Sequence, residues 1–196
     1  LVWSRKVYGS PFIFAKQGDV IHLSSLEGAT INIGDGSGQI KENGPRIPGT
    51  VSHLVASDSA LTIATNSNRL YIFNRLQSDK DPIQILLESQ VSSLQSIQSH
   101  GANYLLIGLS NQTVILYNEA GAPLWKHQGK NSIFTQPIVS EDIAWIDQGN
   151  EVVGLSIKDG TIVKKLSTPG GAGTPYIAGH TLFSASPKRF LYGFSL

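Results

Sequence analysis

The stretch TVILYNEAGAPLWK, residues 113–126, contains the unit that the rest of the sequence repeats. Alternating apolar residues predict a strand over residues 114–117 and a second strand that ends at Trp125. Between them, Gly121 supplies a turn conformation that residues with a side chain resist. Two weaker copies share this turn glycine: residues 31–41 with Gly38, and residues 154–165 with Gly160.

The spacing of the predicted third strands gives the period of the repeat. These strands are centred on residues 32, 72, 116, 155 and 193, so the steps are 40, 44, 39 and 38 residues. A period of about 40 residues with four short strands in each unit is typical of β-propeller blades. A four-stranded sheet with two apolar faces has to pack against a neighbour on each side. We therefore predict one all-β domain, a β-propeller of about five four-stranded blades.

The two ends of the chain suggest how the ring closes. The fifth unit ends after its third strand, whereas residues 1–7 resemble the outer strand that ends a unit. We expect residues 1–7 to supply the missing fourth strand, because closure removes the two exposed sheet edges. The alternative is that the chain was cut from a longer propeller. The predicted blades cover residues 9–47, 50–88, 91–129, 131–168 and 171–196 plus 1–7.

Composition argues against several classes of function. The net charge is +1, whereas a general nucleic-acid binder needs a basic excess to neutralise phosphates. The chain has no cysteine, which excludes disulfides, thiolate zinc sites and cysteine nucleophiles. No apolar run approaches the roughly 20 residues of a membrane-spanning helix. Because methionine is also absent, we expect that a leader has been removed or that the sequence is an excised domain.

We find no pattern of catalytic, cofactor-binding or metal-binding residues in the sequence. His53 and His100 lie on or just after predicted inner strands, but no HxH or HxxxH spacing supports a metal site. Residues 35–38, DGSG, resemble a calcium loop with a single carboxylate. Glu88 and Asp58 are the candidate pair for glycoside chemistry, which needs two converging carboxylates. We predict a protein that is not an enzyme and binds neither cofactor nor metal.

The last turn of the second unit departs from the repeat, since residues 76–82, LQSDKDP, are longer and more charged. An insertion in one turn of a repeat is often where a binding surface has been added. We predict that Leu76 anchors a protein partner, and that Asp79, Lys80 and Asp81 add directional charge contacts. The alternative is an ordinary solvated loop.

The unit at residues 116–125 resembles the repeat of the PQQ-like, or quinoprotein-type, propeller family. In that family, a turn glycine is followed by apolar residues and a tryptophan that docks between blades. The resemblance implies that Trp125 is buried between the third blade and a neighbour. It implies structural roles for five residues of this chain: Trp3, Gly38, Gly121, Trp125 and Gly160.

The same resemblance bears on function. Quinone-dependent members of the family use larger rings, a bound calcium and a catalytic aspartate, for which this chain has no matching carboxylate cluster. The resemblance therefore points to non-catalytic members, similar to the propeller lipoprotein of the bacterial outer-membrane barrel-assembly machinery. It implies a protein-interaction scaffold in the periplasm or cell envelope. A carbohydrate- or small-ligand-binding propeller, and a glycoside hydrolase or lyase, are the alternatives.

Overall fold

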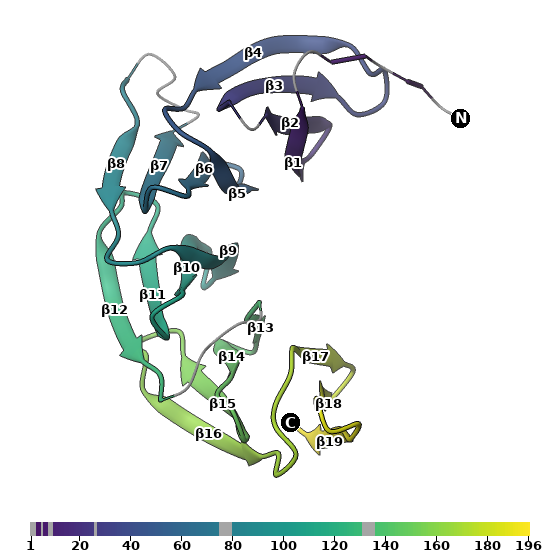
Figure 1. Ribbon diagram of the computed structural model, residues 1–196, viewed down its shortest axis with the longest axis vertical. Helices are drawn as coiled ribbons and strands as arrows, with labels where there is room; N and C mark the ends of the chain where they lie inside the picture. Colours follow the sequence, from purple (N-terminus) through teal and green to yellow (C-terminus); the bar gives the residue numbers. More distant parts are fainter. Residues whose placement is uncertain (1–2, 5, 8–9, 26, 75–79, 131–135) are drawn as a thin grey trace. The chain divides into compact units, whose positions relative to one another are not determined.

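The computed structural model describes residues 3–4, 6–7, 10–25, 27–74, 80–130 and 136–196 (Figure 1). In this part of the chain every regular element is a β-strand, and the strands form four four-stranded sheets and one three-stranded sheet. Each sheet is antiparallel and its strands are neighbours in the order of the sequence. The prediction of an all-β chain built from repeated four-stranded sheets is confirmed.

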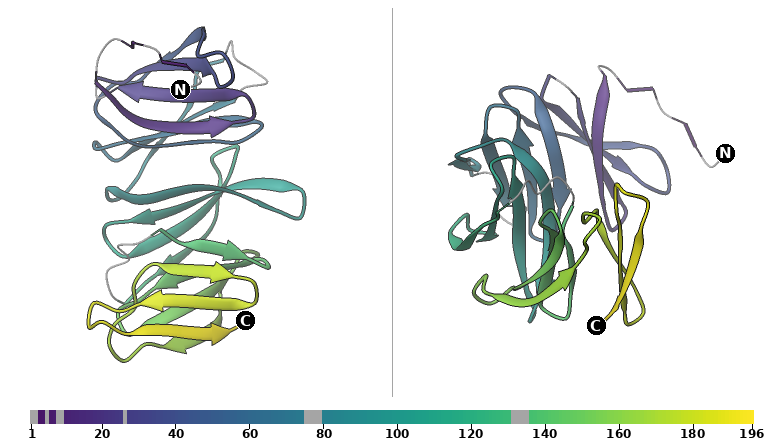
Figure 2. Two further views of the ribbon diagram at one scale, coloured as in Figure 1. Left: turned by 90° about the vertical axis from the view of Figure 1, so that its right-hand side faces the viewer. Right: turned by 60° about the horizontal axis from the view of Figure 1, so that its bottom comes forward.

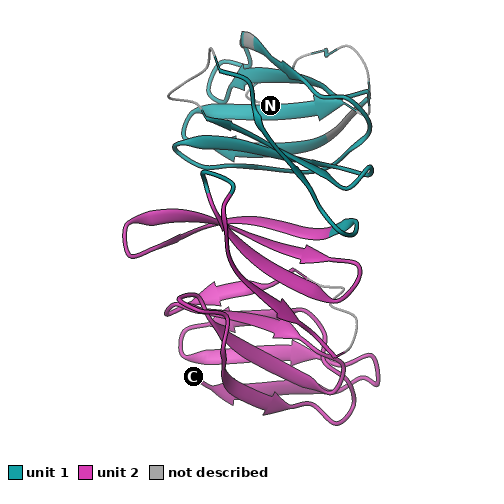
Figure 3. Cartoon of the chain, turned by 90° about the vertical axis from the view of Figure 1, so that its left-hand side faces the viewer, with its two compact units in different colours: residues 1–91, 119–121 teal, residues 92–118, 122–196 magenta. Residues whose placement is uncertain are grey.

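The chain divides into two compact units, residues 1–91 with 119–121 and residues 92–118 with 122–196 (Figure 3). The first unit holds two complete sheets. The strands of its first sheet are β1 (Pro11–Gln17), β2 (Val20–Ser25), β3 (Ala29–Gly34) and β4 (Ile40–Arg46). The strands of its second sheet are β5 (Val51–Ala56), β6 (Ala60–Thr65), β7 (Arg69–Asn74) and β8 (Ile83–Leu86).

The remaining strands belong almost wholly to the second unit, where they run antiparallel within each sheet (Figure 2). The third sheet contains β9 (Val91–Ser99), β10 (Ala102–Leu109), β11 (Thr113–Asn118) and β12 (Pro123–Gln128). The fourth contains β13 (Ile138–Ser140), β14 (Ile143–Asp147), β15 (Glu151–Ser156) and β16 (Ile162–Ser167). The fifth contains β17 (Pro175–Ala178), β18 (Thr181–Ala185) and β19 (Leu191–Ser195).

Burial is highest in the middle strands of each sheet. Every residue of β6 is buried, whereas β8, the last strand of the same sheet, is mostly exposed. A middle strand is covered on both faces, so it reads as a continuous apolar run. In the second unit one core cluster joins the third and fourth sheets, with Leu106 and Leu116 on one side and Ile146 and Leu155 on the other. These two sheets therefore pack against each other.

A β-bulge recurs where the third strand meets the fourth. It lies between Asn32 and Ile33 in the first sheet, between Leu116 and Tyr117 in the third, and between Gly154 and Leu155 in the fourth. The second sheet shows no register shift between β7 and β8. A bulge bends and twists the strand that carries it. The longer turn of the second sheet thus accompanies a different geometry of its last strand pair.

The predicted closing strand lies at the N-terminus. The fifth sheet has three strands among the described residues, and β19 pairs with β18. Trp3, Ser4, Lys6 and Val7 belong to no strand. The indole of Trp3 contacts the first sheet, where its Nε1 donates a hydrogen bond to the carbonyl oxygen of Asp35. Closure of the ring by residues 1–7 stays a prediction.

Candidate functional site

Two tryptophans are docked on turns in the same way, one in each unit. Trp125 of β12 lies over Gly160: a Cβ added to this glycine would sit 2.7 Å from Cδ2 of the indole. The indole Nε1 of Trp125 also donates a hydrogen bond of 2.7 Å to the carbonyl oxygen of Ile157. Trp3 lies over Gly38 and donates to Asp35. Both glycines have positive φ, +71° and +63°. Each turn therefore needs its glycine for two reasons: the backbone has a positive φ, and the indole occupies the space where a side chain would lie.

The third turn glycine, Gly121, receives a different side chain. An added Cβ there would lie 2.9 Å from Cγ2 of Ile83 and 3.2 Å from Cδ1 of Ile85, both on β8. All three glycines are thus covered by an apolar side chain that comes about 35 residues earlier in the sequence. The role of the glycine is constant along the repeat, while the residue that covers it varies.

Each docked tryptophan is connected to an aspartate in a tight turn. In the second unit, Ile157 accepts from Trp125 and donates its N–H to the carbonyl oxygen of Asp142 at 2.8 Å. In the first unit, Asp35 accepts from Trp3 and donates its N–H to the carbonyl oxygen of Asp19 at 2.8 Å. The docking site therefore positions the β13–β14 turn as well as the turn that it covers.

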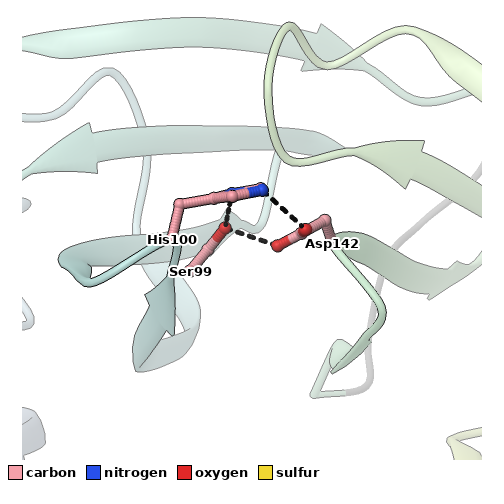
Figure 4. A network of polar contacts seen from close by, with 3 residues as sticks. All are labelled: Ser99, His100 and Asp142. Carbon is pink, nitrogen blue, oxygen red and sulfur yellow. Dashed lines mark hydrogen bonds and ion pairs between the residues drawn. The ribbon is translucent and has the colours of Figure 1, made fainter.

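Asp142 belongs to a network of polar side chains in the second unit (Figure 4). Ser99, the last residue of β9, donates from its hydroxyl to Oδ1 of Asp142 at 2.5 Å. His100, in the β9–β10 turn, has Nδ1 at 3.0 Å from the Ser99 hydroxyl and Nε2 at 3.3 Å from Oδ2 of Asp142. Both carboxylate oxygens are therefore engaged, which holds the side chain in one orientation.

The two turns that carry this network are two-residue hairpin loops with left-handed backbone. His100 and Gly101 have φ of 49° and 76°, and Glu141 and Asp142 have φ of 50° and 60°. Hairpin loops of this kind prefer asparagine or aspartate followed by glycine, because most side chains resist positive φ. The β9–β10 turn has the expected glycine second, whereas the β13–β14 turn begins with Glu141, an unusual residue in this conformation.

A pocket of about 290 Å³ opens beside the network. Its walls come from the β9–β10, β13–β14 and β15–β16 turns and from β12, which contributes Leu124. Tyr104 of β10 and Lys158 of the β15–β16 turn complete the polar part of the lining. Next to Lys158, the N–H and hydroxyl of Thr161 donate to Asp159 and lower the pKa of its carboxyl, so this side chain stays ionised.

Ser99, His100 and Asp142 are the residue types of a hydrolytic triad, but the hydrogen bonds differ from those of one. In a triad the histidine takes the serine proton, and the carboxylate binds the other ring nitrogen. Here the Ser99 hydroxyl donates to the carboxylate itself, and Ser99 is buried. The network therefore acts as a polar link between two turns. Among the described residues no group of three potential metal ligands comes together.

Of the residues predicted to bind a partner, Leu76 and Asp79 lie outside the described residues. Lys80 and Asp81 are exposed and are separated from β8 by Pro82. On β8 itself, Leu86 is 73% exposed and Ile83 is 38% exposed. Leu86 is thus exposed on one face of the second sheet, whereas Ile83 lies on the opposite face with Ile85, over Gly121.

The candidate carboxylate pair does not converge. Asp58 lies in the β5–β6 turn, where it accepts from Nε2 of Gln17 at 3.0 Å. Glu88 follows Leu87, whose N–H donates to Asn68 in the turn at the other end of these strands. A strand of the length of β6 separates the two turns by roughly 20 Å, so the pair cannot act on one glycosidic bond.

Other candidate sites also have structural partners. Asp35 of the calcium-like loop forms an ion pair of 2.5 Å with Lys16, whose pKa is raised by this contact. His53 has Nδ1 at 3.2 Å from the Ser52 hydroxyl. Ser99 and Asp142 were not predicted from the sequence. A local signal lies in the same turn as Asp142, where Glu141 has a left-handed backbone that is unusual for glutamate.

Searches for similar proteins found no matching family model and no matching curated protein. Solved structures do match. BamB from Moraxella catarrhalis has a TM-score of 0.70 and 15% identity over 93% of this chain and 60% of that one. A chain of the Mitotic Checkpoint Complex has a TM-score of 0.71 and 14% identity over 94% and 63%. BBS1N in complex with ARL6DN has a TM-score of 0.69 and 16% identity over 92% and 63%.

The fold is that of a β-propeller. At these identities the similarity concerns the fold alone. This propeller chain spans about three fifths of the length of the structures it matches. Within the described part of the propeller, there is no helix long and apolar enough to cross a membrane.

Proposed function

We propose that this protein is a non-catalytic protein-interaction scaffold. The observation that carries the proposal is the edge of the second sheet. There β8 exposes Leu86, and the exposed charges of Lys80 and Asp81 come shortly before the strand. Exposed apolar side chains beside charged ones are the usual composition of a protein-binding surface, in which the apolar residues anchor and the charges select.

The backbone of this edge favours the same function. β8 is the last strand of its sheet, so one of its sides is not paired within that sheet. Natural proteins cover such edges or use them to bind an added strand. Residues 76–82 precede this edge, and we propose that Leu76 and Asp79 extend the binding surface that Lys80 and Asp81 begin.

The similar structures are consistent with this proposal. Two of the three are described as protein complexes, the Mitotic Checkpoint Complex and BBS1N with ARL6DN. For the cellular setting, we propose a bacterial cell-envelope or secretion assembly with a periplasmic location. Support comes from the resemblance of residues 116–125 to the quinoprotein-type repeat, and from the fold similarity to a bacterial protein, BamB.

The test is affinity capture from the native host followed by mass spectrometry. The bait is compared with two variants, one with Asn-Gly in place of residues 76–82 and one with Leu86→Ser. Leu86 is exposed, and an Asn-Gly turn suits two neighbouring antiparallel strands, so the fold should persist while the captured partner is lost. Leu191→Ser is the matched control, because Leu191 is 71% exposed on a different sheet and should leave capture unchanged.

Two outcomes contradict the proposal. If both variants capture the same partner as the unchanged chain, the surface is elsewhere. If the purified protein turns over a sugar or a quinone, and Asp58→Asn or Glu88→Gln abolishes the turnover, the protein is an enzyme and not a scaffold.

A further inference from the structure

The pocket of the second unit presents a carboxylate that is fixed before any ligand arrives. Asp142 is held by Ser99 and His100, yet its side chain remains 47% exposed. A carboxylate offers about four lone-pair sites, so two protein hydrogen bonds leave room for a ligand on each oxygen. Ile157 fixes the backbone of the same residue by donating to its carbonyl oxygen. Asp142 is therefore a preorganised hydrogen-bond acceptor.

The surface next to this carboxylate is apolar. Leu124 is 48% exposed at the pocket, and Tyr104 and Ile157 also line it. A carboxylate beside an aliphatic and aromatic wall is complementary to a long cationic side chain, whose methylene stem packs on the wall while its head group binds the acceptor. An anionic or purely apolar ligand would leave one of the two features unused.

The surrounding charges favour a cation as well. Lys158 lines the pocket, but its neighbour Asp159 stays ionised and offsets it. Glu141, exposed in the same turn as Asp142, adds a further negative charge. The β13–β14 turn thus carries two carboxylates side by side in the sequence.

The residue that begins the β13–β14 turn is unusual. A left-handed backbone suits glycine, asparagine and aspartate, whereas Glu141 has the same conformation with φ of 50°. Positions that break a local preference are concentrated at functional sites. Here the unusual residue adds a negative charge next to Asp142 in the sequence.

We propose that this pocket receives an arginine or lysine side chain of the protein partner. The proposal rests on the scaffold function and adds a second contact to it. The cationic head group binds Asp142, in a forked geometry when it is a guanidinium. The stem of the side chain lies on Leu124 and Tyr104. Ser99 and His100 orient the carboxylate without contacting the partner.

The experiment is an NMR titration of the full chain with N-acetyl-arginine methylamide. We expect amide shifts in residues 99–101, 141–143 and 156–158. The neutral probe N-acetyl-citrulline methylamide has the same shape and should bind at least about tenfold more weakly, since a hydrogen bond to a charged group is being replaced. The anionic probe N-acetyl-glutamate methylamide should cause no shifts there.

Asp142→Asn is the matching variant. Asparagine has the same shape and tolerates a left-handed turn, so the fold should persist, and binding of the arginine probe should fall about tenfold or more. Asp19→Asn is its control, because Asp19 occupies the corresponding turn of the first unit and its carbonyl oxygen accepts from Asp35. The proposal is overturned if Asp142→Asn binds the arginine probe unchanged, or if the wild-type chain shows no preference for arginine over citrulline.

The scaffold function is judged by a different result. When the unchanged chain captures a partner but shows no arginine preference in the titration, only the pocket proposal fails. When the titration succeeds and capture finds no partner, the scaffold function fails and the cation-binding pocket stands.

Discussion

The docked tryptophans of the two units have the same local geometry in different surroundings. In both, the indole covers a turn glycine and donates a hydrogen bond to the residue three positions before that glycine. That residue in turn donates its own N–H to the carbonyl oxygen of an aspartate in a tight turn. Trp125 is only 8% exposed and belongs to a core cluster that joins two sheets, whereas Trp3 is half-buried and lies outside any strand.

The difference shows that the repeat itself gives the turn geometry, whereas the burial of the tryptophan depends on the surrounding strands. The turn, the glycine and the hydrogen bond are local and recur in both units. Burial depends on the strand that carries the tryptophan, and β12 is paired along its length with β11. The aspartates differ in the same way, since Asp142 meets Ser99 and His100 of a neighbouring turn.

The largest effect is expected from Trp125→Ala. Removing this side chain opens a cavity between two packed sheets, so the free energy of unfolding should fall by roughly 3–5 kcal/mol. Chemical denaturation followed by circular dichroism measures it. Trp125→Phe keeps most of the volume and loses the Nε1 hydrogen bond, and should cost about 1 kcal/mol. A wild-type stability for Trp125→Ala combined with loss of a partner would show that the residue binds and does not pack.

Trp3→Ala sharpens the comparison directly. Because Trp3 is half-buried and carried by no strand, its removal should lower the unfolding free energy by only about 1–2 kcal/mol. The same denaturation assay applies. A loss as large as that of Trp125→Ala would indicate that Trp3 is covered by more of the chain, as the predicted closing strand requires.

Gly160→Ala tests the turn beneath Trp125. Alanine there has an unfavourable positive φ, which costs about 1 kcal/mol, and its Cβ also collides with the indole. Gly18→Ala is the matched control, since Gly18 has φ of +50° and no atom within 4 Å of an added Cβ. The difference between the two melting temperatures isolates the cost of displacing the tryptophan. Equal effects would mean that the indole moves aside freely.

The smallest effect concerns pH and His127, two residues after Trp125 on β12. Burial lowers the pKa of its imidazole below 6.5, so the folded chain binds fewer protons than the unfolded chain. Stability is therefore highest above pH 6.5 and falls as the pH drops through that value. His127→Gln should flatten this part of the stability profile. An identical slope in wild type and His127→Gln contradicts the prediction.

The strands and their turns follow from short stretches of sequence. Alternating apolar residues fixed the strand pair around Gly121, and the spacing of such pairs predicted repeated four-stranded sheets. These properties are local, because a strand and its hairpin partner are joined by a few residues and a turn glycine is selected by its own backbone conformation. The position of Trp125 after that turn was readable for the same reason.

The contacts between sheets were decided by the tertiary structure. Ser99 and Asp142 are 43 positions apart, and nothing in either sequence neighbourhood specifies the other. They meet because two sheets pack face to face with their tight turns at the same end. Asp58 and Glu88 are apart for a simpler reason, since the length of β6 separates the two ends of the second sheet where they lie. The sequence around a residue predicts which strand or turn contains it. Its partners across a sheet interface depend on how whole sheets stack, which many residues determine together.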